Sequence, residues 1–237
     1  MIFIMPKKEN VQKMFDSIAG NYDRLNHILS LDIDKSWRKK AVREITGGGT
    51  ALEILDVACG TGDFAIGIAE AAAPGSRVTG ADISEKMLAV GREKTVAAGL
   101  DDKIHLEYGD CENLKYPDES FDRVSVAFGV RNFEHLEKGL REMRRVLKQN
   151  GKLVILELSV PGNPILRFLY KLYFLHILPA IGGMVSGDKA AYRYLPASVL
   201  RFPRPERFCS MMQSAGFREV ACRSLTFGIC RMFTGIR

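Results

Sequence analysis

The sequence predicts an α/β fold built on a doubly wound, mostly parallel sheet. From residue 53 to residue 157, short apolar segments of strand length alternate with longer segments of helical periodicity. The first apolar run, Ile54 to Val57, leads into a turn containing Gly60 and Gly62, and a helical pattern resumes at Phe64. A strand, a tight turn and a helix in this order predict a ligand site at the carboxyl ends of the strands.

Two helices are expected before the sheet. Apolar residues recur at helical spacing from Val11 to Ile18, and a second apolar face runs from Ile28 to Ile45. Gly47 to Gly49 then form a flexible joint into the first strand. We therefore expect residues 1–46 to be a helical cap on a single domain that spans residues 1–237.

The alternation predicts five strands with helices between them. The expected strands are residues 53–58, 77–81, 104–108, 121–128 and 152–157, and the expected helices are residues 64–73, 84–99 and 136–147. After Ser159 the alternation stops, and residues 160–205 form an insertion of helical, aromatic-rich character. The chain then continues as a helix and two β-rich runs, at residues 206–215, 219–225 and 229–234.

Composition limits the class of protein. A chain of 237 residues with 46% hydrophobic and 26% charged residues suits one soluble domain, and its net charge of +6 favours an anionic partner, either nucleic acid or membrane headgroups. The five cysteines form no C-x-x-C pair and the four histidines lack metal-ligand spacing, so we expect a reducing cytosol and no metal. Arg167 and Lys171 interrupt the most apolar region, residues 165–185, which favours a segment lying on a membrane over one crossing it.

The glycine turn points to one cofactor class. A dinucleotide fingerprint would need a third glycine at Ala65. Asp56, Gly60 and Gly62 instead resemble the first motif of S-adenosylmethionine-dependent methyltransferases, with Ala58 at the position of the usual first glycine. The resemblance implies S-adenosylmethionine as cofactor and S-adenosylhomocysteine as product. It also implies a class I methyltransferase (Rossmann-like) fold, whose seven-stranded sheet ends in an antiparallel hairpin.

The other expected cofactor contacts follow the motif. Asp82 ends the second strand roughly 20 residues after the turn, where an acid reaches ribose hydroxyls, although a helix cap would use the same residue type. Asp110 and Cys111 follow the third strand, where this class presents a carboxylate and an amide to adenine; a plain polar turn is the alternative. Thr61 and Asp63 are expected near the methionine end of the cofactor, and Asp63 is equally suited to cap a helix.

A family resemblance covers nearly the whole chain. Residues 22–30, continuing to Trp37, resemble the first signature of the quinone-biosynthesis C-methyltransferases. These are demethylmenaquinone methyltransferase and 2-methoxy-6-polyprenyl-1,4-benzoquinol methylase. The second signature is matched by residues 145–148 with Gly151, Glu157 and Ser159, and residues 185–188 and 192–196 are also similar. The family implies methyl transfer to a ring carbon of a polyprenylated hydroquinone. The small Ala127 favours demethylmenaquinol over the benzoquinol of ubiquinone biosynthesis.

The resemblance assigns substrate roles to two groups of residues. Arg131 and Asn132 follow the fourth strand; we expect Arg131 to stabilise a phenolate or to orient a water, and Asn132 to orient that water or a quinol oxygen. The alternative for Arg131 is an ordinary salt bridge. Tyr22, Asp23 and Asn26 are expected to close the site.

The polyprenyl tail needs an apolar channel, which residues 165–185 can supply while docking on the inner face of the membrane; a buried helix pair is the alternative. Two rival functions are a nucleic-acid methyltransferase and a non-catalytic cofactor-binding protein. The first lacks an N-P-P-[YF]-like motif after the fourth strand, so no nucleic-acid partner is expected. The second would bind cofactor without transferring methyl. The sequence leaves the oligomeric state open, a homodimer included.

Overall fold

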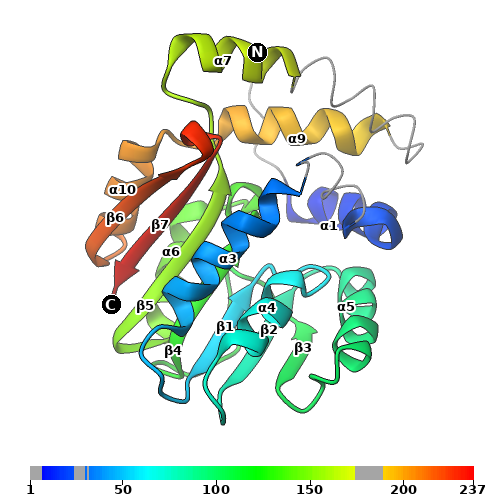
Figure 1. Ribbon diagram of the computed structural model, residues 1–237, viewed down its shortest axis with the longest axis vertical. Coiled ribbons are helices and arrows are strands. Elements are labelled where there is room, and N and C mark those ends of the chain that lie inside the picture. The colour runs from blue at the N-terminus through cyan, green and yellow to red at the C-terminus, as the bar shows by residue number, and fades with distance from the viewer. Residues whose placement is uncertain (1–6, 24–29, 31, 174–188) are drawn as a thin grey trace.

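A computed structural model describes residues 7–23, 30, 32–173 and 189–237 (Figure 1). Seven strands form one sheet in the order β3-β2-β1-β4-β5-β7-β6. The first five pair in parallel, and β7 pairs antiparallel with both β5 and β6. This confirms the predicted sheet and its closing hairpin. The strands are β1 (Glu53–Val57), β2 (Arg77–Asp82), β3 (Ile104–Tyr108), β4 (Phe121–Ala127), β5 (Leu147–Leu158), β6 (Arg218–Leu225) and β7 (Cys230–Ile236).

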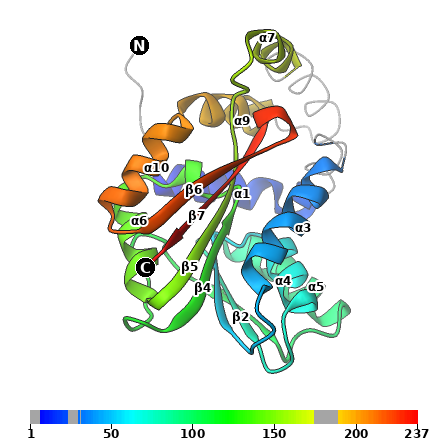
Figure 2. The same ribbon diagram turned by 60° about the vertical axis from the view of Figure 1, so that its left-hand side comes forward.

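Helices cover both faces of the sheet. Figure 2 shows α3, α4 and α5 on one face and α6 and α10 on the other, while α1, α7 and α9 lie beyond the carboxyl ends of the parallel strands. The described helices are α1 (Lys8–Ile18), α3 (Ile33–Thr46), α4 (Asp63–Ala71), α5 (Glu85–Ala97), α6 (Leu136–Val146), α7 (Pro164–Leu172), α9 (Lys189–Arg201) and α10 (Pro205–Ser214), with short 3₁₀ turns η1 (Ala19–Asn21), η2 (Val130–Asn132) and η4 (Thr226–Gly228).

The interior strand β5 shows why the sheet is fixed in register. Val154 and Leu156 pack into the core that contains α3 and α4, whereas Leu153 and Ile155 pack into the core that contains α6 and α10. All four side chains have no exposed area. Because successive side chains point to opposite faces, a shift of β5 by one residue would move each of these side chains from one core into the other.

The start of β5 differs from the sequence prediction by five residues. Strand β5 begins at Leu147, not at Lys152, and follows α6 without a loop. Leu147 pairs with Phe121 and Lys152 pairs with Arg123, so the register shifts between the two pairs and the intervening residues bulge out of the ladder. Because the residues of this bulge are polar, the apolar pattern of the sequence does not show that the strand begins before them.

The insertion after β5 contributes α7 and α9. Helix α7 is capped by Asn163, whose Oδ1 accepts hydrogen bonds from the amides of Ile165 and Leu166. In the described part of the chain no helix is long and apolar enough to cross a membrane. The second half of the predicted segment 165–185 lies outside the described residues.

Candidate functional site

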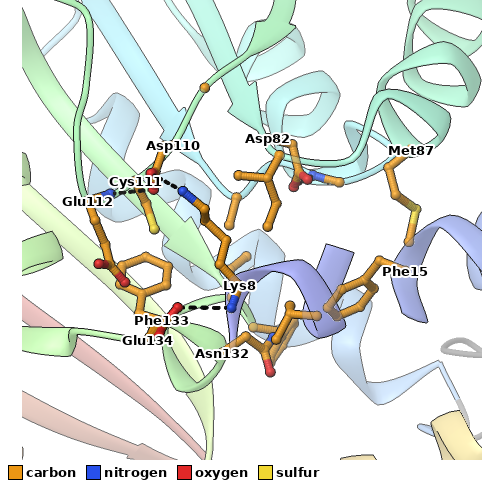
Figure 3. A pocket seen from close by; sticks show the side chains of 18 of the residues that line it. Lys8, Phe15, Asp82, Met87, Asp110, Cys111, Glu112, Asn132, Phe133 and Glu134 are labelled. Atoms are coloured by element: carbon orange, nitrogen blue, oxygen red, sulfur yellow. Dashed lines mark hydrogen bonds and ion pairs between the residues drawn. The ribbon is translucent and has the colours of Figure 1, made fainter. Parts of the chain in front are cut away.

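A cavity opens at the carboxyl ends of β1, β2, β3 and β4, beneath helix α1 (Figure 3). It holds about 700 Å³, part of it open to solvent. This is the edge at which the sheet topology predicts a ligand. The lining residues are Lys8, Val11, Phe15, Tyr22, Ala58, Gly60, Asp82, Ile83, Met87, Gly109, Asp110, Cys111, Glu112, Ala127, Phe128, Gly129, Asn132, Phe133 and Glu134.

Asp82 anchors the glycine turn from the neighbouring strand. Its Oδ2 accepts a hydrogen bond of 2.8 Å from the amide of Gly60, and its Oδ1 accepts one of 2.8 Å from the amide of Ser84. Burial raises the pKa of Asp82 above its ordinary value, against the opposing effect of these amides. Each carboxylate oxygen keeps a second lone pair, so Asp82 can still accept hydrogen bonds from a diol.

Asp110 lies at the other end of the cavity, after β3. Its Oδ1 accepts from the amide of Glu112 at 3.0 Å, and its Oδ2 accepts from Lys8 Nζ at 2.7 Å. Burial alone would raise the pKa of Asp110, but the hydrogen bonds from Lys8 and the Glu112 amide outweigh it and hold the pKa below its ordinary value. An ionised carboxylate here suits an exocyclic amino group of a base.

Gly109 and Gly129, at the ends of β3 and β4, pack closely against neighbouring strand ends, which leaves no room for a side chain at either position. A Cβ on Gly109 would lie 2.9 Å from the Cβ of Ala81, and a Cβ on Gly129 would lie 2.7 Å from the Cβ of Ala58. Ala58 itself has a left-handed φ of 53°, a conformation that explains the glycine usual at this position in the motif. Two acids separated by a bare backbone and apolar walls fit the ribose and base of an adenosine.

Four of the predicted cofactor residues line this cavity: Gly60, Asp82, Asp110 and Cys111. The others, Asp56, Thr61, Gly62 and Asp63, do not line it. Asp56 is buried, and its Oδ1 accepts a 2.7 Å hydrogen bond from Ser125 while its Oδ2 has no hydrogen-bond partner among the described residues. Burial raises the pKa of Asp56 to about 7.

A polar network ties the N-terminal segment to the same turn. Asp23 accepts a 2.5 Å hydrogen bond from Thr61 Oγ1 and a 2.6 Å hydrogen bond from Lys94 Nζ, and Lys94 also forms an ion pair with Asp63. Thr61, Gly62, Asp63 and Asp23 are therefore adjacent to the cavity without lining it. Tyr22 does line it, and Asn26 lies outside the described residues.

Arg131 and Asn132 follow β4 but project to different places. Asn132 lines the cavity, and its Oδ1 accepts a 3.0 Å hydrogen bond from Tyr194. The Arg131 side chain is 6% exposed and pairs at 2.7 Å with Glu157, which has no exposed area. The Arg131 amide donates to the same carboxylate at 3.1 Å. The structure thus gives the Arg131 charge a buried partner and does not place the guanidinium in the cavity.

Sequence patterns missed Lys8, Glu112, Phe133 and Glu134 as lining residues. The helical spacing of α1 placed apolar residues correctly but gave no signal for Lys8 at its start. The Lys8 amide donates to Glu134 Oε2 at 3.0 Å, a contact across 126 residues that local spacing cannot show.

The model of the ubiE/COQ5 methyltransferase family matches residues 4–237. The chain belongs to this family. It is 48% identical over 229 residues to a demethylmenaquinone methyltransferase of Deinococcus radiodurans, covering 97% of this chain and 93% of the relative. It is 46% identical over 231 residues to one of Bacteroides fragilis (98% and 94% covered). It is 45% identical over 237 residues to the ubiquinone/menaquinone biosynthesis C-methyltransferase UbiE of Geobacter sulfurreducens (99% and 91%).

Solved structures share the fold at lower identity. The [4+2]-cyclase SpnF has a TM-score of 0.70 and 21% identity, covering 94% of this chain and 78% of its own. A putative S-adenosyl-L-methionine-dependent methyltransferase of Methanococcus maripaludis has a TM-score of 0.64 and 21% identity, covering 93% of each chain. Together with the family, these results confirm a class I fold and an S-adenosylmethionine-dependent methyltransferase.

Proposed function

We propose that this chain transfers the methyl group of S-adenosylmethionine to a ring carbon of demethylmenaquinol, forming menaquinol and S-adenosylhomocysteine. The observation that carries the proposal is the identity of 48% over nearly the full length to a relative named for this reaction. The small side chain of Ala127 in the cavity supports the menaquinol product. Because a relative of 45% identity is named for both quinones, the benzoquinol of ubiquinone biosynthesis is the second candidate acceptor.

Asp82 and Asp110 are the proposed cofactor anchors. Asp82 would accept hydrogen bonds from the ribose hydroxyls, and Asp110 would accept one from the amino group of adenine. Ile83 and Met87 would pack against the apolar faces of the adenosine. The cofactor supplies an electrophilic methyl on a sulfonium. Anchoring the adenosine at two acids fixes where that methyl points, and such alignment supplies much of the rate in a transfer between two bound partners.

Asn132 is the proposed contact to the quinol. Its amide lies in the cavity and is oriented by the Tyr194 hydroxyl, so it can donate to a quinol oxygen whose proton is lost as the ring carbon becomes nucleophilic. Tyr22, Phe128 and Phe133 provide aromatic walls for a flat ring. Arg131 serves best as a positioning residue, since its amide and guanidinium both bind Glu157 and hold the η2 turn that presents Asn132.

The membrane is the proposed source of the prenylated substrate. Ile165, Phe168, Leu169 and Leu172 lie at helical intervals on α7 and are 72%, 68%, 53% and 47% exposed. A helix with this apolar stripe suits contact with the inner face of a bilayer, in the manner of an interfacial helix. Helix α7, which carries the stripe, lies beyond the carboxyl ends of the parallel strands (Figure 1), and the cavity opens at the same end of the sheet.

Assaying both acceptors tests the proposal. Purified protein is incubated with S-adenosylmethionine and either reduced demethylmenaquinone or the reduced benzoquinone. We expect methylation of the first acceptor and a loss of turnover of on the order of a hundredfold in Asn132→Ala. Asn10→Ala, an exposed amide on α1, is the matched control and should retain activity. Methylation of the benzoquinol alone would reverse the order of the two candidates.

A further inference from the structure

A second hollow lies between α6, α9 and α10 and is distinct from the cofactor cavity. It encloses about 1230 Å³, part of it open to solvent, and shares Phe133 with the cavity. Figure 2 shows α6 and α10 side by side, with α9 above them. We call this hollow the basic groove. Its lining residues are Val130, Arg131, Phe133, His135, Leu136, Glu137, Lys138, Arg141, Arg201, Phe202, Pro203, Arg207 and Met211.

The groove gathers positive charge from two helices. Lys138 and Arg141 project from α6 and Arg207 from α10; all three are exposed, and none has a side-chain hydrogen bond or ion pair with a described residue. Among the described residues that line the groove, Glu137 is the one acid. Three cations from two helices around one hollow can surround an anionic group from several sides.

The groove also connects to the substrate side of the cavity. The Arg201 guanidinium lies 5.6 Å from the centre of the Tyr194 ring, and the Tyr194 hydroxyl donates to Asn132 Oδ1. An anion held near Arg201 would therefore lie two side chains away from the residue proposed to contact the quinol. This placement relates the groove to the reaction without making it part of the cofactor site.

Apolar surface beside the groove indicates what kind of anion it meets. Leu200, next to Arg201 at the end of α9, is 46% exposed. Helix α7, which carries the apolar stripe, lies above α9 in Figure 1. Between residues 160 and 205 the sequence has Asp188 as its one acid. Cations next to exposed apolar side chains match a bilayer surface, where phosphates lie above hydrocarbon, better than they match a polynucleotide.

We propose that the basic groove binds the phosphate of an anionic phospholipid and thereby docks the protein on the bilayer that holds its substrate. The inference deepens the proposed function and rests on it for the lipid nature of the substrate. The groove supplies the electrostatic part of docking and the α7 stripe supplies the apolar part. Docking by a phosphate-binding groove weakens with salt and disappears on vesicles without anionic lipid.

Vesicle binding tests the groove with a matched control. The double variant Arg141→Gln/Arg207→Gln removes two groove cations. The control, Arg77→Gln/Lys103→Gln, removes two exposed cations at the amino ends of β2 and β3. On vesicles containing phosphatidylglycerol we expect the groove variant to bind on the order of tenfold more weakly than the wild type, and the control to bind like the wild type. Equal binding by the two variants would overturn the proposal.

Competition identifies the ligand. Inorganic phosphate at the same phosphate concentration as the vesicles should not displace the protein. Groove-dependent displacement by free phosphate, or groove-dependent capture of a single-stranded oligonucleotide in preference to vesicles, would overturn the assignment to lipid.

Turnover separates this inference from the proposed function. With demethylmenaquinol in detergent micelles the groove variant should match the wild type, and with the quinol in anionic vesicles it should be slower by on the order of tenfold. Absence of methyl transfer by the wild type in both settings would refute the proposed function. The vesicle-binding comparison would still decide the groove.

Discussion

Lys8 of helix α1 and Asp110 of the loop after β3 form an ion pair across the cavity, with 2.7 Å between Nζ and Oδ2 (Figure 3). The contact joins residues that are 102 positions apart. Since Val11 and Phe15 of the same helix also line the cavity, the pair fixes one wall of the cofactor site.

Lys8→Met should weaken cofactor binding. Losing the ion pair releases the start of α1 from Asp110, and we expect S-adenosylhomocysteine to bind about two- to fivefold more weakly, mainly through faster dissociation, because half-exposed pairs contribute little. Calorimetry and stopped-flow fluorescence measure both quantities. Lys13→Met, an exposed change on the same helix, should bind as the wild type does. Unchanged or tighter binding by Lys8→Met would show that the pair does not hold the wall.

Asp110→Asn should change the preference for the base. A carboxylate accepts from the amino group of adenine, whereas an amide nitrogen donates to the carbonyl of hypoxanthine. We expect the affinity for S-adenosylhomocysteine to fall roughly tenfold or more. The affinity for S-adenosylhomocysteine divided by the affinity for S-inosylhomocysteine should fall further, because the amide favours hypoxanthine. Competition binding with both compounds measures the ratio, with Asp102→Asn as an exposed control. A ratio unchanged from the wild type would place the base elsewhere.

Asp56 should make stability depend on pH. Burial raises its pKa from 3.8 to about 7, so the folded protein binds this proton more tightly than the unfolded chain does. The contribution of this proton to the free energy of unfolding is fully present below pH 3.8. It is lost as the pH rises from 3.8 to about 7, at about 1.4 kcal/mol per pH unit. The free energy of unfolding of the wild type minus that of Asp56→Asn should therefore fall across this range.

Urea unfolding of both proteins at several pH values measures this difference. Other titrating groups cancel because they are common to the two proteins. A difference that stays constant or rises with pH would show that Asp56 is ionised in the folded state.

Arg131→Met should destabilise the fold. It leaves the Glu157 carboxylate buried without its cation, which typically costs about 3–5 kcal/mol. The double variant Arg131→Met/Glu157→Gln should lose less stability than the sum of the two single variants, and chemical denaturation measures all three. If Arg131→Met were as stable as the wild type and bound quinol normally but had no turnover, the residue would act directly on the phenolate and the positioning role would be wrong.

The sequence revealed the sheet because its central strands are buried on both faces. In β5, Val154 and Leu156 on one side and Leu153 and Ile155 on the other produce a continuous apolar run, which is the signal of a strand buried on both faces. Asp82 and Asp110 could be predicted as cavity residues because Asp82 ends β2, Asp110 follows β3, and the carboxyl ends of parallel strands meet at one edge.

The sequence could not predict in which direction a side chain points within a turn. Arg131 and Asn132 are neighbours in the 3₁₀ turn η2, where consecutive side chains diverge, so Asn132 enters the cavity and Arg131 reaches Glu157 on β5. The contact of Lys8 with Asp110 depends on where α1 packs, which its own amphipathic pattern does not specify.

The most direct test of the account follows an isotopically labelled methyl group from S-adenosylmethionine into reduced demethylmenaquinone. We expect one labelled methyl on the quinol ring carbon, identified by NMR and mass spectrometry, with formation of S-adenosylhomocysteine in equal amount. We also expect loss of the product in Asp82→Ala, because the Asp82 carboxylate accepts from the Gly60 amide and faces the cavity. Label that remains on the cofactor, or is found on a quinol oxygen instead of a ring carbon, would contradict the proposed function.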